Sequence, residues 1–182
     1  MAVAYGPITA LELSATSCNI TDHTTIVCLT SPGMGANHSW HVTVASQTCN
    51  KSAVLSSYYA PSNITFSPAE FPTSGLSNFT VFGSDLGPLW SSSLWGILAA
   101  DVTVTYGPYT TNCSVTVDSS RLSCRVAEGV GSGHSLSIQV ADQVGAATTA
   151  ARYIFPVLTS VSRSVFDSRG NEAFVLRYVG LA

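Results

Sequence analysis

The sequence is poor in charge, above all in positive charge. Only 9% of its 182 residues are charged, seven Lys and Arg stand against ten Asp and Glu, and Lys51 is the single lysine. Soluble domains carry about 25% charged residues. Binding to nucleic acid needs a clustered basic face, and attraction to anionic membranes needs basic segments. The composition therefore excludes nucleic acid and charged membrane surfaces as expected partners.

Long hydrophobic runs and a leader are also missing. The longest apolar stretch, residues 94–100, falls far short of the ~20 residues of a membrane-spanning helix. Residues 1–7 lack the basic and apolar regions of a signal peptide. We therefore expect no membrane span. If the protein is secreted, we expect this chain to be a processed product or an internal segment of a longer one.

Catalytic and metal-binding patterns are scarce. No G-x-S-x-G nucleophile elbow occurs, no C-x-x-C occurs, and the four histidines are not spaced with the cysteines. Ser132 lies two residues before His134, but the surrounding glycines favour a turn between strands over a nucleophile. Asp85 and Asp142 lack a calcium-loop pattern around them. We predict no enzyme, no metal site and no cofactor.

Serine and threonine are abundant, and asparagine is placed selectively. Ser and Thr make up 46 residues, a polar uncharged surface that also offers sites for O-linked sugars. Six of the seven asparagines lie in Asn-x-Ser/Thr, which would arise by chance in roughly one such chain in a thousand. We predict N-glycosylation of these six in an extracellular or cell-surface protein: Asn19, Asn37, Asn50, Asn63, Asn78 and Asn112.

The five cysteines agree with an oxidising compartment. Cys18 and Cys28, ten residues apart, occupy places in an internal repeat equivalent to those of Cys113 and Cys124, eleven apart. We predict a Cys18–Cys28 and a Cys113–Cys124 disulfide, each worth ~3 kcal/mol in the chain-entropy account. Cys49 is left over, either as a buried free thiol or as a bond to another chain.

That internal repeat has a period near 95 residues. Its matching segments are Tyr5-Gly6-Pro7 with Tyr106-Gly107-Pro108, residues 33–35 with 129–131, 42–44 with 138–140, 57–61 with 152–156, and 61–87 with 156–182.

Short β-rich runs dominate both copies. They cover residues 79–82, 102–104, 115–117, 136–140 and 174–176, most with period two, and Gly and Pro punctuate them about every ten residues. No amphipathic helix is evident. Many short strands in a ~95-residue unit indicate an all-β fold built of immunoglobulin-like β-sandwiches.

The order of motifs resembles the IPT/TIG domain (immunoglobulin-like, plexin, transcription factor). Cys28 is followed by the turn Ser31-Pro32-Gly33-Met34-Gly35, the strand 42–44, an aromatic–Pro joint, and a strand ending in residues 81–87. The second copy departs from the family at residues 125–129, which lack the proline, and residues 88–101 look like an insertion. Trp90 and Trp95 in that insertion could stack on sugar rings, although capping the sandwich or burial in a subunit contact is favoured.

The resemblance spans nearly the whole chain and implies binding or scaffolding, seldom catalysis. The family occurs in plexins, growth-factor receptors, large surface proteins and some transcription factors. In its terms residues 61–155 form one complete sandwich, 1–60 the C-terminal part of another, and 156–182 the N-terminal part of another. A sandwich split in this way exposes apolar strand edges, which favour aggregation. Either the chain was cut from a longer tandem array, or another subunit supplies the missing strands.

In the second case, residues 156–182 of one subunit would complete the sandwich begun by residues 1–60 of the next. Such head-to-tail strand addition does not close and builds a filament or surface coat from copies of the same chain. The expected inter-subunit strands carry Val157, Leu158, Val161, Phe174, Leu176 and Tyr178. The alternative is a fragment of a large receptor or adhesion ectodomain whose tandem modules bind a protein or glycan on the cell surface.

Overall fold

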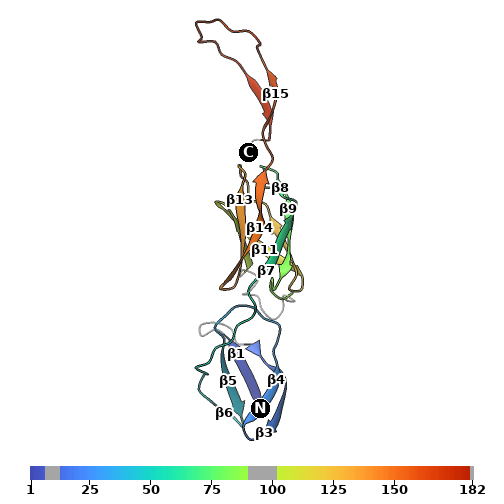
Figure 1. Cartoon of the computed structure of the whole chain (residues 1–182), viewed down its shortest axis with the longest axis vertical. Helices are drawn as coiled ribbons and strands as arrows, with labels where there is room; N and C mark the ends of the chain where they lie inside the picture. Colours follow the sequence, from blue (N-terminus) through green and yellow to red (C-terminus); the bar gives the residue numbers. More distant parts are fainter. Residues whose placement is uncertain (7–12, 90–101, 181–182) are drawn as a thin grey trace.

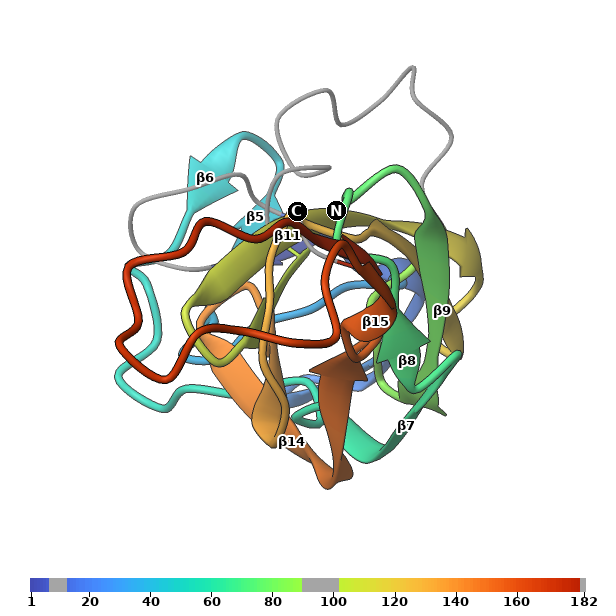
Figure 2. The same cartoon turned by 90° about the horizontal axis from the view of Figure 1, so that it is seen from above.

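The computed structural model describes residues 1–6, 13–89 and 102–180, and within these ranges every regular element is a β-strand. Figure 1 shows three parts along one line: an N-terminal unit (residues 1–60), a central sandwich (61–154) and a C-terminal hairpin (157–179). In Figure 2, seen along that line, the three parts overlie one another. The described residues include no helix that could cross a membrane.

The central sandwich contains eight strands in the order β7-β9-β12-β11-β10-β13-β14-β8. The long strand β11 belongs to both layers, because Asn112 pairs with β10 whereas Cys113 pairs with β12. One continuous ladder thereby folds into two facing layers. The strands are β7 (Ser62–Ser67), β8 (Glu70–Phe71), β9 (Asn78–Ser84), β10 (Val102–Tyr106), β11 (Tyr109–Val117), β12 (Arg121–Arg125), β13 (His134–Val140) and β14 (Gln143–Tyr153).

The core of this sandwich follows from residue alternation. In β10, alternate residues from Val102 to Tyr106 are buried, since successive side chains of a strand point to opposite faces. An aromatic cluster fills one end, where the Phe71 ring centroid lies 4.8 Å from that of Phe79 and 5.3 Å from that of Tyr106. The Cys113–Cys124 disulfide is buried in the same core.

The N-terminal unit has two separate sheets. The first has the order β2-β1-β5-β6, and the second is the β3–β4 hairpin, crossed by the Cys18–Cys28 disulfide. Among its described residues the buried hydrophobic side chains are those of Val3, Tyr5 and Leu13, which form a small core. The strands are β1 (Ala2–Gly6), β2 (Leu13–Ser14), β3 (Thr16–Asp22), β4 (Thr25–Leu29), β5 (Ser39–Val44) and β6 (Gln47–Thr48).

The C-terminal hairpin consists of β15 (Val157–Val161) and β16 (Leu176–Val179), in which every residue is exposed. The sequence predicted a strand over 174–176, but β16 begins at Leu176. The reason is local: Ser162 N still donates to the Val175 carbonyl at 2.9 Å, but Val175 N donates to Ser162 Oγ at 2.8 Å, so a side chain takes the place of the second backbone bond of this pair. Phe174 therefore lies just before the strand.

The remaining strand predictions are confirmed, since residues 79–82, 102–104, 115–117 and 136–140 lie within β9, β10, β11 and β13. The all-β class is confirmed as well. Trp90, Trp95 and most of the expected insertion lie outside the described residues. The division of a second sandwich between the two chain ends stays a prediction.

Candidate functional site

Two tyrosines organise one turn of the central sandwich. The Ala127 backbone N donates to Tyr106 Oη at 2.7 Å, and Tyr153 Oη donates to the Ala127 carbonyl at 2.8 Å. Burial, and then the hydrogen bond with Tyr106, raise the pKa of Tyr153 above its ordinary value. The phenol therefore stays protonated and keeps its ability to donate.

The N-terminal unit contains the same arrangement. Ser31 N donates to Tyr5 Oη at 2.9 Å, Tyr58 Oη donates to the Ser31 carbonyl, and the two phenol oxygens are 2.6 Å apart. Burial, and then the bond with Tyr5, raise the pKa of Tyr58. His38 meets Tyr58 edge-on at 5.5 Å, as His134 meets Tyr153 at 5.8 Å. The two units thus build the same local core from residues about 95 positions apart.

The units differ in what covers the tyrosines. In the central sandwich Phe71 and Phe79 approach Tyr106 to 5.3 and 5.9 Å, and both come from the stretch that precedes β10. Residues 1–60 contain no phenylalanine. In the N-terminal unit Trp40 stacks on Tyr5 at 4.2 Å.

An open groove is lined on one side by Trp40, the residue that stacks on Tyr5. It has a volume of about 330 Å³ and lies between the β1–β5 sheet and the β3–β4 hairpin. Its lining is mostly apolar: Val3, Ala15, Ile26, Cys28, Leu29, Thr30, Trp40 and Val42. Because Ile26, Val27 and Leu29 of β4 are exposed, the core of this unit is open along β4.

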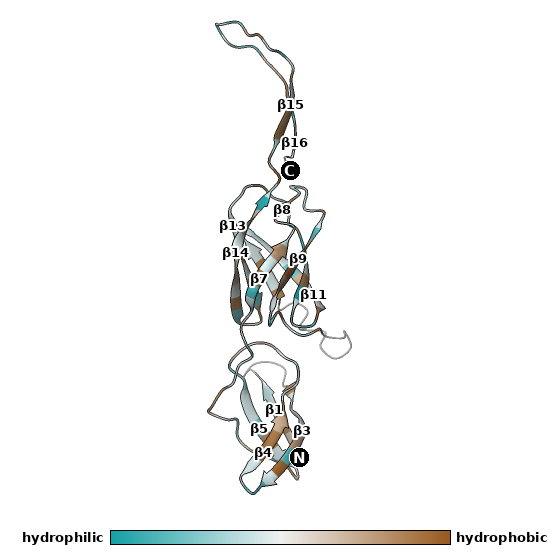
Figure 3. Cartoon of the chain, turned by 45° about the vertical axis from the view of Figure 1, so that its right-hand side comes forward, coloured by the Kyte–Doolittle hydropathy of each residue, from teal (hydrophilic) through white to brown (hydrophobic). Residues whose placement is uncertain are grey.

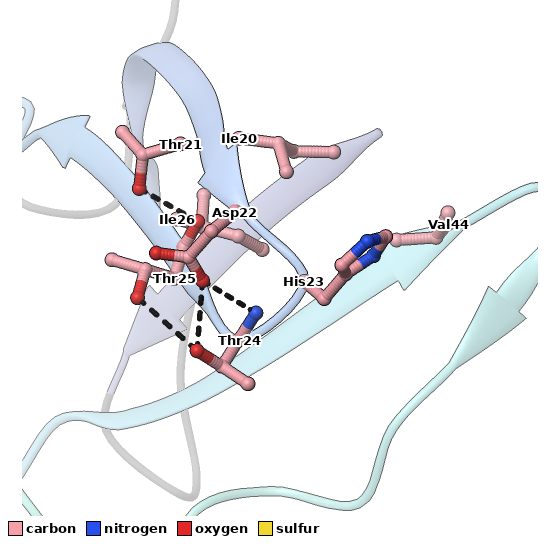
Figure 4. A pocket seen from close by; sticks show the side chains of 8 residues that line it. All are labelled: Ile20, Thr21, Asp22, His23, Thr24, Thr25, Ile26 and Val44. Carbon is pink, nitrogen blue, oxygen red and sulfur yellow. Dashed lines mark hydrogen bonds between the residues drawn. The ribbon is translucent and has the colours of Figure 1, made fainter.

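The turn between β3 and β4 borders a second depression (Figure 4). Ile20, Ile26 and Val44 give it apolar walls, and Asp22 supplies a carboxylate. Asp22 Oδ1 accepts hydrogen bonds from Thr24 Oγ1 and from Thr24 N, each at 2.7 Å. These bonds, the side-chain one foremost, lower the pKa of Asp22, so its negative charge persists at neutral pH.

The C-terminal hairpin exposes apolar residues that could fill such a groove. Figure 3 shows apolar residues in brown along β15. The rings of Phe166 and Phe174 meet edge to face with centroids 5.4 Å apart, and an Arg163–Glu172 ion pair at 2.6 Å joins the two arms. The six residues expected to bind another subunit are 46–55% exposed: Val157, Leu158, Val161, Phe174, Leu176 and Tyr178.

The structure places the predicted glycosylation sites on the surface and joins the predicted cysteine pairs. All six sequon asparagines are exposed, so a glycan on each would meet solvent; their modification stays a prediction. Both expected cysteine pairs are disulfide-bonded in the structure. Cys49 forms no disulfide and is exposed, so the alternative of a buried thiol is wrong. Its sulfur accepts a hydrogen bond from Val42 N instead.

Ser132 lies in a glycine-rich turn, while His134 Nε2 bonds the Val130 carbonyl at 3.0 Å. The histidine thus has a structural partner. Within residues 1–6, 13–89 and 102–180, no cluster of three His, Cys, Asp or Glu side chains is placed to hold a metal ion.

The joint between the N-terminal unit and the central sandwich was missed from the sequence. Ala36 N donates to Asp142 Oδ1 at 2.8 Å, and Gln143 Nε2 donates to the Tyr58 carbonyl at 2.8 Å. In the sequence Asp142 was considered only as a calcium ligand, and the missing calcium-loop pattern spoke against that role. The partners Ala36 and Tyr58 belong to the N-terminal unit and lie 106 and 85 residues away along the chain, so no local pattern could have found these contacts.

Comparison with known families agrees with this geometry. The IPT/TIG domain model matches residues 61–154, just over half of the chain. The chain belongs to the IPT/TIG domain family. No curated protein and no solved structure matches it. The IPT/TIG match coincides with the central sandwich, from the buried Pro61 to the end of β14. IPT/TIG domains are usually non-catalytic, and together with two disulfides this domain is consistent with a secreted or surface protein.

Proposed function

We propose that this IPT/TIG protein is an extracellular, N-glycosylated structural protein whose copies assemble head to tail into a filament or surface coat. In this assembly the C-terminal hairpin of one copy completes the N-terminal unit of the next. One observation carries the proposal. The N-terminal unit repeats the tyrosine-pair core without the phenylalanines that cover it in the central sandwich, and the C-terminal hairpin holds such a phenylalanine pair about half exposed.

The placement of the two parts supports a chain of copies. Figure 1 shows the N-terminal unit and the hairpin at opposite ends of an elongated molecule. A hairpin docked on the next copy leaves that copy's own hairpin uncovered. Such a heterologous contact repeats without closing, and therefore extends in one dimension.

The surface chemistry supports the same proposal. An apolar hairpin exposed on both strands is unfavourable for an isolated protein in water, and large exposed apolar patches mark interaction sites. Low charge, six exposed sequons and two disulfides fit a protein solvated by sugar in an oxidising compartment. The interface needs no ligand other than a second copy of the chain.

The test compares the full chain with a variant that lacks residues 156–182, using electron microscopy and sedimentation at neutral pH. We expect long polymers from the full chain and monomers from the shortened one. The synthetic 156–182 segment should shorten the polymers when it is added, because it occupies the N-terminal units. A full chain that stays monomeric, or a shortened chain that polymerises equally well, would contradict the proposal.

A further inference from the structure

We infer the register of this contact: β16 of one copy pairs antiparallel with β4 of the next, with Leu176 opposite Ile26 and Phe174 opposite Cys28. The inference rests on the proposed head-to-tail assembly and specifies how its two surfaces meet. It also places the Phe166 and Phe174 rings in the groove lined by Trp40, which stacks on Tyr5.

The central sandwich supplies the template. There β9 pairs antiparallel with β12, so that Val81 lies opposite Leu122 and Phe79 opposite Cys124. In the internal repeat Leu176 corresponds to Val81 and Phe174 to Phe79. Likewise Ile26 corresponds to Leu122, and Cys28 to Cys124, the disulfide-bonded residue of the same strand.

The edge that this pairing requires is free. β12 has a strand on each side, β11 and β9. β4 pairs with β3 on one side, and no other strand of the described residues pairs with it. Its residues Ile26, Val27 and Leu29 are exposed along that edge. An unpaired apolar edge of this kind is a template for strand addition.

The aromatic side chains fit the groove by the same correspondence. Phe71 and Phe79 are in contact and bury against Tyr106 and Tyr153. Phe166 and Phe174, the equivalent pair, already meet edge to face on the free hairpin. In the docked register they lie over the apolar walls formed by Ile26, Cys28 and Trp40.

Charge favours this register over its neighbours. Arg177 falls opposite Thr25, and Thr25 itself pairs with Asp22 on β3, so the arginine and the carboxylate occupy one cross-strand row. The two opposite charges lie on the same face with β4 between them, so their attraction is the modest one of an exposed ion pair. A slip by one residue would turn Leu176 and Phe174 to the solvent face. A slip by two would remove Arg177 from the row of Asp22.

Engineered disulfides test the register in the full chain. In a Cys49→Ser background, one preparation carries Val27→Cys and another Val175→Cys, an outward-facing pair that the register sets opposite each other. We expect the mixture to form disulfide-linked dimers under mild oxidation. The matched control pairs Val27→Cys with Ala173→Cys, which is two residues from Val175 on the same face and leaves Arg177 in place. That shift leaves the Cα atoms about 7–8 Å apart, too far for a disulfide, so most of the dimer band should be lost.

Sedimentation of the Cys49→Ser parent tests the assembly separately from the register. If the parent forms no polymers, the proposed assembly is wrong. If the parent polymerises but the control pair cross-links as well as the test pair or better, the register is wrong and the assembly stands. Polymers without cross-linking of the Val27→Cys and Val175→Cys pair overturn the register in the same way.

Discussion

The two units resemble each other most clearly in the hydrogen bonds of four tyrosine side chains. Tyr5, Tyr58, Tyr106 and Tyr153 were visible in the sequence as repeated aromatic positions. Their pairing was not, because each phenol bonds the backbone of a distant turn, at Ser31 or at Ala127. The repeat therefore predicted which tyrosines are equivalent. The hydrogen bonds that these tyrosines share could be identified only in the structure.

The six sequon asparagines give a prediction at this scale. Because all six are exposed, we expect glycans on most of them in protein from its native source. Enzymatic removal of N-glycans should lower the intact mass by several sugar units, and peptide mapping should find Asp in place of the modified Asn residues. Asn171, which lies outside a sequon, is the internal control and should remain Asn. An unchanged mass would contradict the extracellular assignment.

Whole elements show what alternation in the sequence can and cannot predict. The strands of the central sandwich were predictable because their apolar residues alternate and pack into one core. β16 begins later than predicted because Val175 N donates to the Ser162 side chain, which leaves only one of the two backbone bonds between Val175 and Ser162. The strand pairs β7–β9 and β15–β16 occupy equivalent places in the repeat. Only the structure reveals that the first packs into the core of the central sandwich while the second is exposed to solvent.

This difference predicts unequal effects of equivalent substitutions. Phe71 is fully buried, so Phe71→Ala should lower the free energy of unfolding by about 3–5 kcal/mol. Phe166 is 45% exposed in the free chain, and Phe166→Ala should cost less than about 1 kcal/mol in unassembled protein. Denaturant unfolding of dilute protein measures both values.

The same pair of variants also separates folding from assembly. Phe166→Ala should weaken polymer formation at concentrations where the parent protein assembles. Equal losses of stability in the two variants would mean that Phe166 is already covered within the single chain. Normal assembly of Phe166→Ala would mean that Phe166 does not contribute to the contact between copies.

At the scale of the whole molecule, the order of the units was predictable from the repeat, but their alignment was not. The N-terminal unit and the central sandwich are joined by polar contacts at a turn, from Asp142 to Ala36 N and from Gln143 to the Tyr58 carbonyl. Met34 also lies near Gly87 across this joint. These contacts hold consecutive units along one line (Figure 1).

If copies assemble as proposed, the same joint recurs between them. Gln47 corresponds to Gln143 in the repeat, and Tyr153 to Tyr58, so Gln47 of the next copy should donate to the Tyr153 carbonyl of the preceding one. Gln47→Ala should therefore leave polymer mass nearly unchanged, because the hairpin still docks, but should make filaments more curved in electron micrographs. Gln143→Ala should bend them similarly, whereas Thr148→Ala, on an exposed face of β14, should not. Filaments of Gln47→Ala that stay as straight as the parent would mean that consecutive copies meet through a joint unlike the one within the chain.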